Sequence, residues 1–260
     1  MRTAGGLAFE GLLMRVLYWL VTFGVVVVAT LASYTWVDFG LARYVHEHPL
    51  AAHAREITTP LASVPNPLVL AAVLFFFVFG LLCVGSPGRP GLWRFGASTC
   101  MSVLAGEEVK RIAKWIFGRP WPETWRVDNP SFIRDGDYHF HWFSGGGAYD
   151  SFPSGHMTSV CAVASVVWIH YPRLRPACLI VSLATAATLI GTNYHFFSDV
   201  LSGAYLGATV GWLVCAVIDP RGRPVPAAGN SGNYVDRIAS AAASKRPPVT
   251  RATPPNPPAE

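Results

Sequence analysis

The sequence predicts an all-α fold, a bundle of six transmembrane helices. Hydrophobic residues make up 52% of the 260 residues and charged residues only 13%, about half the charged share of a soluble domain. Apolar runs recur along the chain at lengths near the roughly 20 residues that a spanning helix needs. Basic residues concentrate between alternate runs, as in multi-pass membrane proteins, and form no stripe that would bind nucleic acid. These observations exclude an ordinary cytosolic protein.

The first predicted span covers residues 16–37 and contains four consecutive valines. It is too long for the apolar core of a signal peptide and lacks a small-x-small cleavage site before polar sequence. Four further spans are visible from hydropathy alone, at residues 67–84, 158–169 with its flanks, 177–194 and 200–218.

The remaining span, predicted over residues 95–117, carries charges. Glu107, Lys110, Arg111 and Lys114 are three or four residues apart, so they share one helical face and can pair with one another. Charged side chains are costly inside a bilayer, so this face should line the bundle interior or a wet cavity. An amphipathic helix lying on the membrane surface is the alternative.

Arginine and lysine set the orientation. The N-terminal segment, the second and fourth loops and the C-terminal segment are basic, whereas the long loops at residues 38–66 and 118–155 balance basic with acidic residues. The predicted location is the cell (inner) membrane. The positive-inside rule places both termini on its cytoplasmic side and both long loops on its outer side. Residues 1–218 form the predicted membrane domain. Residues 219–260, rich in Pro, Ala and Arg, form a predicted cytoplasmic tail that is mostly disordered.

No metal or cofactor is predicted. The five cysteines are scattered without metal-ligand spacing. Asp135, Asp137, His139 and His141 lie close together in the second long loop, but they too lack a recognised ligand spacing. A polar loop that shapes substrate entry is the preferred interpretation.

One candidate site precedes the fourth span, where the chain reads Ser-Phe-Pro-Ser-Gly-His over residues 151–156. A helix that begins here leaves backbone N–H groups free, and its dipole favours an anion. Ser154 can add a hydroxyl donor, and His156 falls in the first turn. The alternative is that Ser154 is an ordinary N-cap.

A second candidate is the pair His195 and Asp199, between the fifth and sixth spans. A carboxylate can hold the Nδ1–H of such a histidine and leave Nε2 free to act as a nucleophile. The alternative is that Asp199 only caps the last helix.

The third candidate is a group of cations at the outer end of the third span, comprising Lys110, Arg111, Lys114 and Arg119. Cations there would neutralise a phosphate in its transition state. Salt bridges to the neighbouring glutamates are the alternative.

With these motifs, the sequence resembles the type-2 phosphatidic acid phosphatase family, within the superfamily that includes vanadium haloperoxidases. The family has three motifs, Lys-x6-Arg-Pro, Pro-Ser-Gly-His and Ser-Arg-x5-His-x3-Asp. Residues 153–156 match the second motif completely, and His195 and Asp199 match the end of the third. The order and positions of the motifs agree over roughly residues 60–218.

The resemblance implies a role for each matching residue. His195 would be the nucleophile that forms a phosphohistidine, with Asp199 orienting it, and His156 would protonate the leaving oxygen. Ser154 and Gly155 would bind phosphate oxygens, and no metal would be needed.

The first motif departs from the family pattern. At the family spacing, Lys114 is followed by Trp121 rather than arginine, while Arg119-Pro120 stands two positions earlier. In the other frame Ile112 replaces the lysine. We prefer the frame with Lys114 and expect Arg119 to supply the phosphate-binding guanidinium.

The third motif departs as well, because Thr188 and Leu189 occupy its Ser-Arg positions. A phosphate-binding cation must then come from elsewhere, and the candidates are Lys110, Arg126 and Arg134.

Together these features predict an integral membrane phosphatase that cleaves a phosphomonoester or pyrophosphate from a lipid at the outer membrane face. Two alternatives stay open: a lipid phosphotransferase using the same histidine, and a catalytically degenerate protein that binds lipid phosphates. The sequence does not identify the lipid or the oligomeric state.

Overall fold

The structure is a computed structural model that describes residues 4–48, 65–84, 90–124 and 129–219. Within these ranges the regular structure is helical and no strand is present. Two isolated β-bridges, Arg119 with Asp150 and Trp121 with Ser131, tie down the loop that follows the third long helix. The all-α prediction is confirmed.

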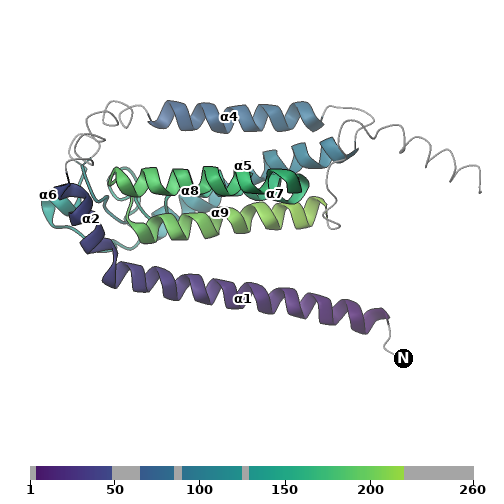
Figure 1. The fold of residues 1–260 in the computed structure, drawn as a ribbon, viewed down its shortest axis with the longest axis horizontal. Helices are drawn as coiled ribbons and strands as arrows, with labels where there is room; N and C mark the ends of the chain where they lie inside the picture. The colour runs from purple at the N-terminus through teal and green to yellow at the C-terminus, as the bar shows by residue number, and fades with distance from the viewer. Residues whose placement is uncertain (1–3, 49–64, 85–89, 125–128, 220–260) are drawn as a thin grey trace, which may run out of the picture. The chain divides into compact units, whose positions relative to one another are not determined.

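Each of the six segments predicted to span the membrane is helical (Figure 1). These long helices are α1 (Ala4–Trp36), α4 (Pro65–Val84), α5 (Pro90–Phe117), α7 (Gly155–His170), α8 (Arg175–Gly191) and α9 (Phe197–Ile218). The described residues also contain two short helices, α2 (Asp38–Glu47) and α6 (Phe132–Asp135), and the 3-10 turn η1 (Pro172–Leu174).

Three of the described helices are long and apolar enough to cross a bilayer, at Leu17–Trp36, Pro172–Gly191 and Phe197–Ile218. Only 6% of the Leu17–Trp36 window is buried, so most of its apolar side chains face outward. In water such a surface would be strongly unfavourable, whereas lipid solvates it. The number of spans stays a prediction.

Helices α7 and α9 form the centre of the bundle and pack at unusually short range. The α9 residues Gly203, Gly207 and Gly211 recur every fourth position and face the α7 backbone. A Cβ at Gly203 would lie 2.5 Å from the Ser154 carbonyl oxygen, and one at Gly207 would overlap the Thr158 carbonyl oxygen. Glycine is therefore needed for this approach, as in small-residue interfaces of membrane helices.

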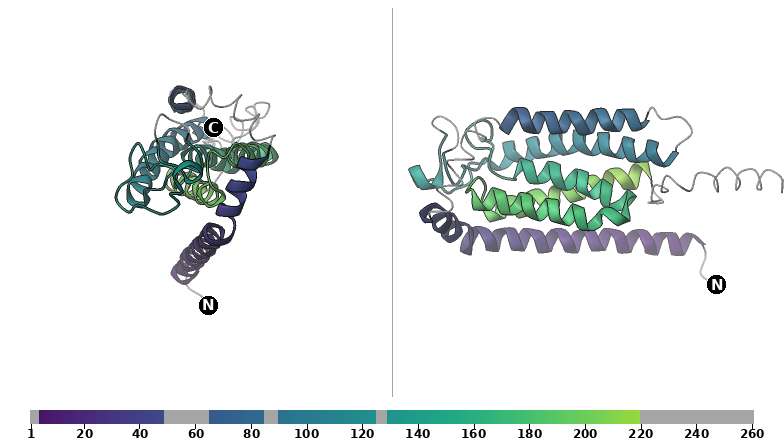
Figure 2. Two further views of the ribbon diagram at one scale, coloured as in Figure 1. Left: turned by 90° about the vertical axis from the view of Figure 1, so that its left-hand side faces the viewer. Right: turned by 45° about the horizontal axis from the view of Figure 1, so that its top comes forward.

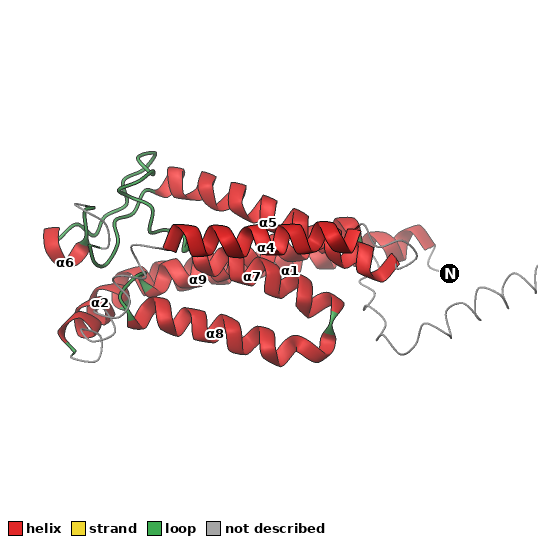
Figure 3. Ribbon diagram, turned by 90° about the horizontal axis from the view of Figure 1, so that it is seen from above, coloured by secondary structure: helices red, strands yellow, loops and turns green. Residues whose placement is uncertain are grey.

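The other long helices surround this pair. Helix α5 packs against both α7 and α9, α4 against α5, α1 against α9, and α8 against α7. Figure 2 shows α4 beside α5 and α1 along the opposite side of the bundle, and Figure 3 shows α8 lying to one side.

One end of the bundle carries α2, α6 and the loop between α5 and α7 (Figure 1). A small apolar cluster of Ala42, Phe132 and Phe196 holds these pieces together, with Ile133 and Tyr138 packed against it. Helix α1 begins at the other end (Figure 1). The candidate residues of all three motifs gather at the end with α2 and α6.

The long helices begin earlier than the predicted spans, and α8 also ends earlier. Helix α8 ends at Gly191, three residues before the predicted end of the fifth span, because the chain turns at Asn193 with a positive φ of 58°. Asp219, the first residue of the predicted tail, forms an ion pair with Arg94 at 3.1 Å. The rest of the predicted tail, residues 220–260, lies outside the described residues.

Candidate active site

A cleft of about 710 Å³ opens where α5, the start of α7 and the turn between α8 and α9 meet. The residues predicted to carry the chemistry contribute five basic or imidazole side chains to its lining, Lys110, Arg111, Lys114, His156 and His195. Ile112, Trp115, Trp121 and Tyr194 form much of its apolar lining. The structure thus brings together residues that lie up to 85 positions apart in the sequence.

The start of α7 forms one wall. Ser154 is the N-cap, and its hydroxyl accepts from the Met157 N–H at 3.4 Å while its own N–H donates to the Asp199 carbonyl at 3.0 Å. Gly155 lies against the cations, since a Cβ there would be 3.4 Å from Lys114 Cε and 3.7 Å from Lys110 Nζ.

Ser154 and Gly155 lie differently relative to the cleft, and the expected phosphate contact of Ser154 stays a prediction. Ser154 is fully buried, does not line the cleft, and acts as the helix cap that the alternative interpretation described. Gly155 does line the cleft, and it presents the N-terminus of α7 there.

A tight turn after α8 presents His195. The N–H groups of Tyr194 and His195 both donate to the Leu189 carbonyl, at 2.9 and 3.1 Å. Asn193 adopts the left-handed conformation that asparagine tolerates best among non-glycine residues, and its amide donates to the Ala42 carbonyl at 3.0 Å. The turn is therefore anchored to α2.

His195 faces His156 across the cleft. Their ring centroids are 6.2 Å apart, and the Tyr194 ring lies against both. His195 is only 3% exposed. Burial lowers the pKa of His195 below its usual range, and the charges of Lys114 and Arg119 act in the same direction while Asp199 opposes them. His195 is therefore neutral near pH 7, as a nucleophile must be.

Asp199 and His195 lie close together but not within hydrogen-bonding distance. His195 Nδ1 is 3.6 Å from Asp199 Oδ2. The Ser151 hydroxyl lies between them, 3.2 Å from His195 Nδ1 and 2.6 Å from Asp199 Oδ2. Asp199 also accepts from the Phe196 N–H at the start of α9, so it is both a cap and a member of the site.

Two lysines of α5 supply positive charge to the cleft. Lys110 Nζ donates to Glu107 at 2.6 Å and to Ser159 at 3.2 Å, which confirms the predicted pairing within the helix. Lys114 Nζ donates to the Asp150 carbonyl. Arg111 pairs with Glu108 at the exposed rim of the cleft.

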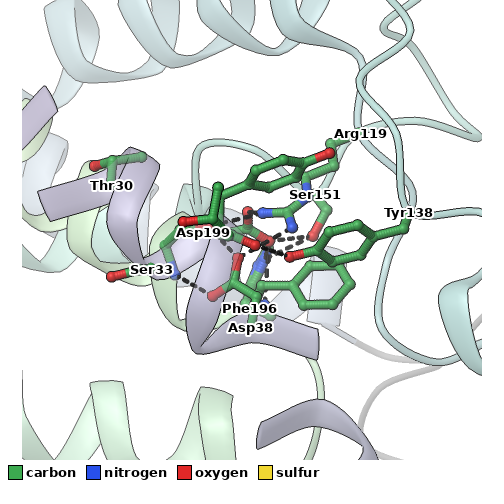
Figure 4. A network of polar contacts seen from close by, with 12 residues as sticks. Thr30, Ser33, Asp38, Arg119, Tyr138, Ser151, Phe196 and Asp199 are labelled. Atoms are coloured by element: carbon green, nitrogen blue, oxygen red, sulfur yellow. Dashed lines mark hydrogen bonds and ion pairs between the residues drawn. The ribbon is translucent and has the colours of Figure 1, made fainter. Parts of the chain in front are cut away.

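Arg119 does not reach the cleft. Its guanidinium is fully buried and bonds to three side chains, Asp199 at 2.6 Å, Ser198 at 2.8 Å and Asp38 at 3.0 Å. It also lies over four aromatic rings, those of Tyr34, Tyr138, Phe140 and Phe196. Figure 4 labels Arg119 with two of them, Tyr138 and Phe196. In this conformation Nη1 and Nη2 of Arg119 donate to protein side chains and not into the cleft, while Nε has no hydrogen-bond partner among the described residues, so the expected role of Arg119 as a phosphate ligand stays a prediction.

Comparison with known sequences agrees with the motifs. The sequence model of the PAP2 superfamily matches residues 91–223, which is just over half of the chain. The chain belongs to the PAP2 superfamily. The predicted resemblance to type-2 phosphatidic acid phosphatases is thereby confirmed.

Two curated relatives match a similar length. The chain is 35% identical to the lipid A 1-phosphatase of Rhizobium etli over 128 residues, 48% of this chain and 51% of that protein. It is 30% identical to the lipid A 1-phosphatase of Rhizobium johnstonii over 122 residues, 47% of each. The chain thus matches about half the length of these relatives. No solved structure matches it significantly.

Leu189 occupies the position of the arginine in the third family motif, and its surroundings are apolar. Leu189 is buried in a hydrophobic cluster with Met157, Cys161 and Val200, and an unpaired charge there would be costly. Of the three candidate replacements, Lys110 lines the cleft, and Arg134 pairs with Asp135 away from it. Arg126 lies outside the described residues.

Three of the loop residues considered as a metal cluster, Asp135, Asp137 and His141, form two separate ion pairs. His141 Nε2 lies 2.9 Å from Asp137, and Asp135 pairs with Arg134. Among the residues that the structure describes, no three His, Cys, Asp or Glu side chains gather around one point.

Sequence reasoning missed two residues of the site, Asp38 and Ser151. Asp38 lies in α2, before the segment matched by the PAP2 superfamily, and no spacing rule links it to Arg119. Burial raises the pKa of Asp38, while Arg119 acts in the opposite direction. Ser151 was visible two residues before the Pro-Ser-Gly-His motif, but only the fold shows that its hydroxyl meets His195.

Proposed function

We propose that this protein is an integral membrane lipid phosphatase that acts through a phosphohistidine on His195. The observation that carries the proposal is the arrangement of His195, His156, Lys110 and Lys114 around one cleft. The pairing of a buried neutral imidazole with a second imidazole and two cations fits phosphoryl transfer, in which positioning and charge neutralisation do most of the work.

In the first step the Nε2 lone pair of His195 attacks phosphorus. The bond from phosphorus to the ester oxygen breaks, and that oxygen takes its electron pair and a proton from the protonated form of His156, which the negative charge of the bound phosphate favours. Both rings line the same cleft with centroids 6.2 Å apart, so His156 lies near a phosphoryl group that enters the cleft to reach His195. Lys110, Lys114 and the N-terminus of α7 at Gly155 neutralise the phosphoryl oxygens.

In the second step a water molecule attacks the same phosphorus. His156 now takes a proton from the water, the phosphorus–nitrogen bond breaks, and its electrons return to His195 Nε2. Inorganic phosphate leaves. Throughout, Nδ1 keeps its proton, and the nearby Asp199 carboxylate stabilises the positive charge on the phosphorylated ring. These residues supply the charge and the protons, so the scheme needs no metal.

The substrate class we propose is a phosphorylated lipid with a bulky polar headgroup. The two curated relatives are both named lipid A 1-phosphatase. A cleft of about 710 Å³ is large enough to admit more than a phosphate, and its rim includes the exposed apolar side chains of Ile112 and Trp115. These side chains would contact the apolar part of the lipid near the interface.

We further propose that all six long helices cross the membrane, with both termini in the cytoplasm and the cleft at the outer face. The distribution of arginine and lysine between the loops supports this orientation. Attachment of a membrane-impermeant thiol reagent to a cysteine introduced at Gly146, but not to one introduced at Pro90, would support it.

The activity is tested by phosphate release from lipid A, phosphatidate and a polyprenyl pyrophosphate, using the full chain purified in detergent. Release should persist in EDTA, should be inhibited by vanadate, and should vanish in His195→Ala. His139→Ala, a histidine exposed in the loop, is the matched control and should retain activity. Lipid-phosphate binding without any release, equal in wild type and His195→Ala, would instead identify a binding protein. Transfer of phosphate to an added acceptor lipid would identify a phosphotransferase.

A further inference from the structure

Ser151 occupies a rigid and fully enclosed position beside the proposed nucleophile. Its side chain has no exposed surface, and its N–H donates to the Arg119 carbonyl at 3.0 Å. Arg119 in turn bonds to Asp199. The backbone on which Ser151 stands is therefore fixed by the same network that fixes the carboxylate.

The two hydrogen bonds of the Ser151 hydroxyl have a definite direction. An ionised carboxylate only accepts, so Ser151 must donate its single hydroxyl hydrogen to Asp199 Oδ2, at 2.6 Å. The serine oxygen is then left as the acceptor for His195, whose Nδ1 is 3.2 Å away. His195 must consequently carry its proton on Nδ1, which leaves the lone pair on Nε2.

The carboxylate itself is engaged elsewhere. Asp199 Oδ1 accepts from Arg119 at 2.6 Å, and Oδ2 accepts from the Phe196 N–H at 3.1 Å as well as from Ser151. The direct distance of 3.6 Å from Oδ2 to His195 Nδ1 exceeds that of a hydrogen bond. Asp199 therefore acts on His195 mainly through the serine hydroxyl.

We propose that Ser151 is a positioning residue of the reaction, which fixes the tautomer and ring orientation of His195 by relaying the hydrogen bond of Asp199. This inference rests on the proposed function, because it assigns Ser151 a role in the attack by His195 Nε2. It adds a third residue to the pair that the family motif contains.

The kinetic test compares Ser151→Ala with Ser151→Thr, which keeps a hydroxyl. Ser151 does not line the cleft, so Ser151→Ala should leave KM within about twofold of wild type. It should lower kcat by about 10- to 100-fold, by analogy with the loss seen when the outer hydrogen-bond partner of a metal-binding histidine is removed. Ser151→Thr should recover at least part of the lost rate.

Ser131→Ala is the matched structural control. Ser131 is also fully buried, and its hydroxyl bonds to Thr124 at 2.9 Å and to the Arg134 N–H at 3.2 Å, but it contacts neither His195 nor Asp199. Its loss should lower the melting temperature in detergent about as much as Ser151→Ala does, while kcat stays near the wild-type value. Equal kcat losses in the two alanine variants would show that Ser151 is merely structural.

A spectroscopic experiment tests the role proposed for Ser151 even if no substrate is found. In ¹⁵N-histidine-labelled protein, the His195 signals are assigned by their loss in His195→Ala. Wild type should show a single tautomer with the proton on Nδ1, and Ser151→Ala should show a mixture of both tautomers. An unchanged tautomer in Ser151→Ala would overturn the role proposed for Ser151 without bearing on the proposed phosphatase activity. A wild type inactive on every lipid would count against the phosphatase activity and would leave the tautomer result standing.

Discussion

The Arg119 guanidinium is bonded to Asp38 at 3.0 Å, across 81 positions of sequence. Asp38 also accepts from the Ser198 N–H at 3.0 Å, next to Asp199 in α9. Asp38 lies outside the segment that the PAP2 superfamily matches, whereas Arg119 and Ser198 lie within it. The N-terminal part of this chain is therefore built into the support of the proposed site (Figure 4).

Asp38→Asn should reduce both stability and activity. The exchange keeps the shape but removes a buried charge-assisted bond to Arg119, worth about 1.5–3 kcal/mol. The loss is measured from thermal or SDS-induced unfolding in detergent. Activity should fall because Arg119 is then held less firmly against Asp199. Unchanged stability would contradict the proposed contribution of α2 to the site.

Arg119→Ala should lower the stability of the fold rather than only the affinity for substrate. It leaves Asp38 and Asp199 buried without their cation, which costs about 3–5 kcal/mol. Arg119→Lys should also destabilise the protein, because a single ammonium cannot reproduce the fork that reaches both carboxylates. The exposed Arg134→Ala is the control and should unfold like wild type. If Arg119→Ala folded normally and only KM rose, Arg119 would be a phosphate ligand after all.

Gly207→Ala should disturb the site from within the bundle. The added methyl overlaps the Thr158 carbonyl, so α7 and α9 must separate, at a cost of about 1–3 kcal/mol. Since α7 carries His156 and α9 carries Asp199, activity should fall as well. Gly40→Ala is the matched control, because Gly40 is helical with open space around it. That change should be neutral or stabilise by up to about 1 kcal/mol.

The pH dependence should reflect the neutral state of His195. Its pKa is lowered by burial first, with Lys114 and Arg119 adding to the effect, so it becomes charged only below its ordinary value near 6.5. For a depressed pKa, the active neutral form is fully present above the ordinary value and is lost as the pH falls through the lowered one. The His195-dependent decline in kcat/KM should therefore lie below pH 6.5.

Lys114→Gln tests the cause of that shift. Removal of this charge should raise the pKa of His195 and move the acid limb of kcat/KM to higher pH on the same substrate, in addition to weakening phosphate binding. Arg134→Gln, distant from the cleft, should leave the limb in place. A limb that does not move in Lys114→Gln would show that another group controls it.

The helices and two motifs could be predicted from the sequence because both are local. Apolar runs of sufficient length form helices wherever they occur, and Pro-Ser-Gly-His begins α7 because its serine is a good N-cap. His195 and Asp199 are likewise close because they are only four residues apart in the sequence. His195 lies just before α9, and Asp199 lies in the first turn of that helix.

The support of the site could not be predicted, because it depends on contacts between distant segments. Arg119 was expected to bind phosphate on the strength of its family position, yet two buried carboxylates and four aromatic rings enclose it. Only one of those carboxylates lies in a family motif. Asp38 is one acidic residue among several in a long loop, and hydropathy gives no reason to bring it to α9.

Direct detection of the phosphorylated enzyme is the most decisive test of the central claim. In His156→Ala, an activated aryl phosphate can still phosphorylate His195, because its leaving group needs no proton, but hydrolysis lacks its base and the intermediate should accumulate. Intact-protein and peptide mass spectrometry after alkaline quenching should find one phosphate on His195, and none when His195→Ala is added. Phosphate on another residue, or hydrolysis by His195→Ala at the wild-type rate, would contradict the account.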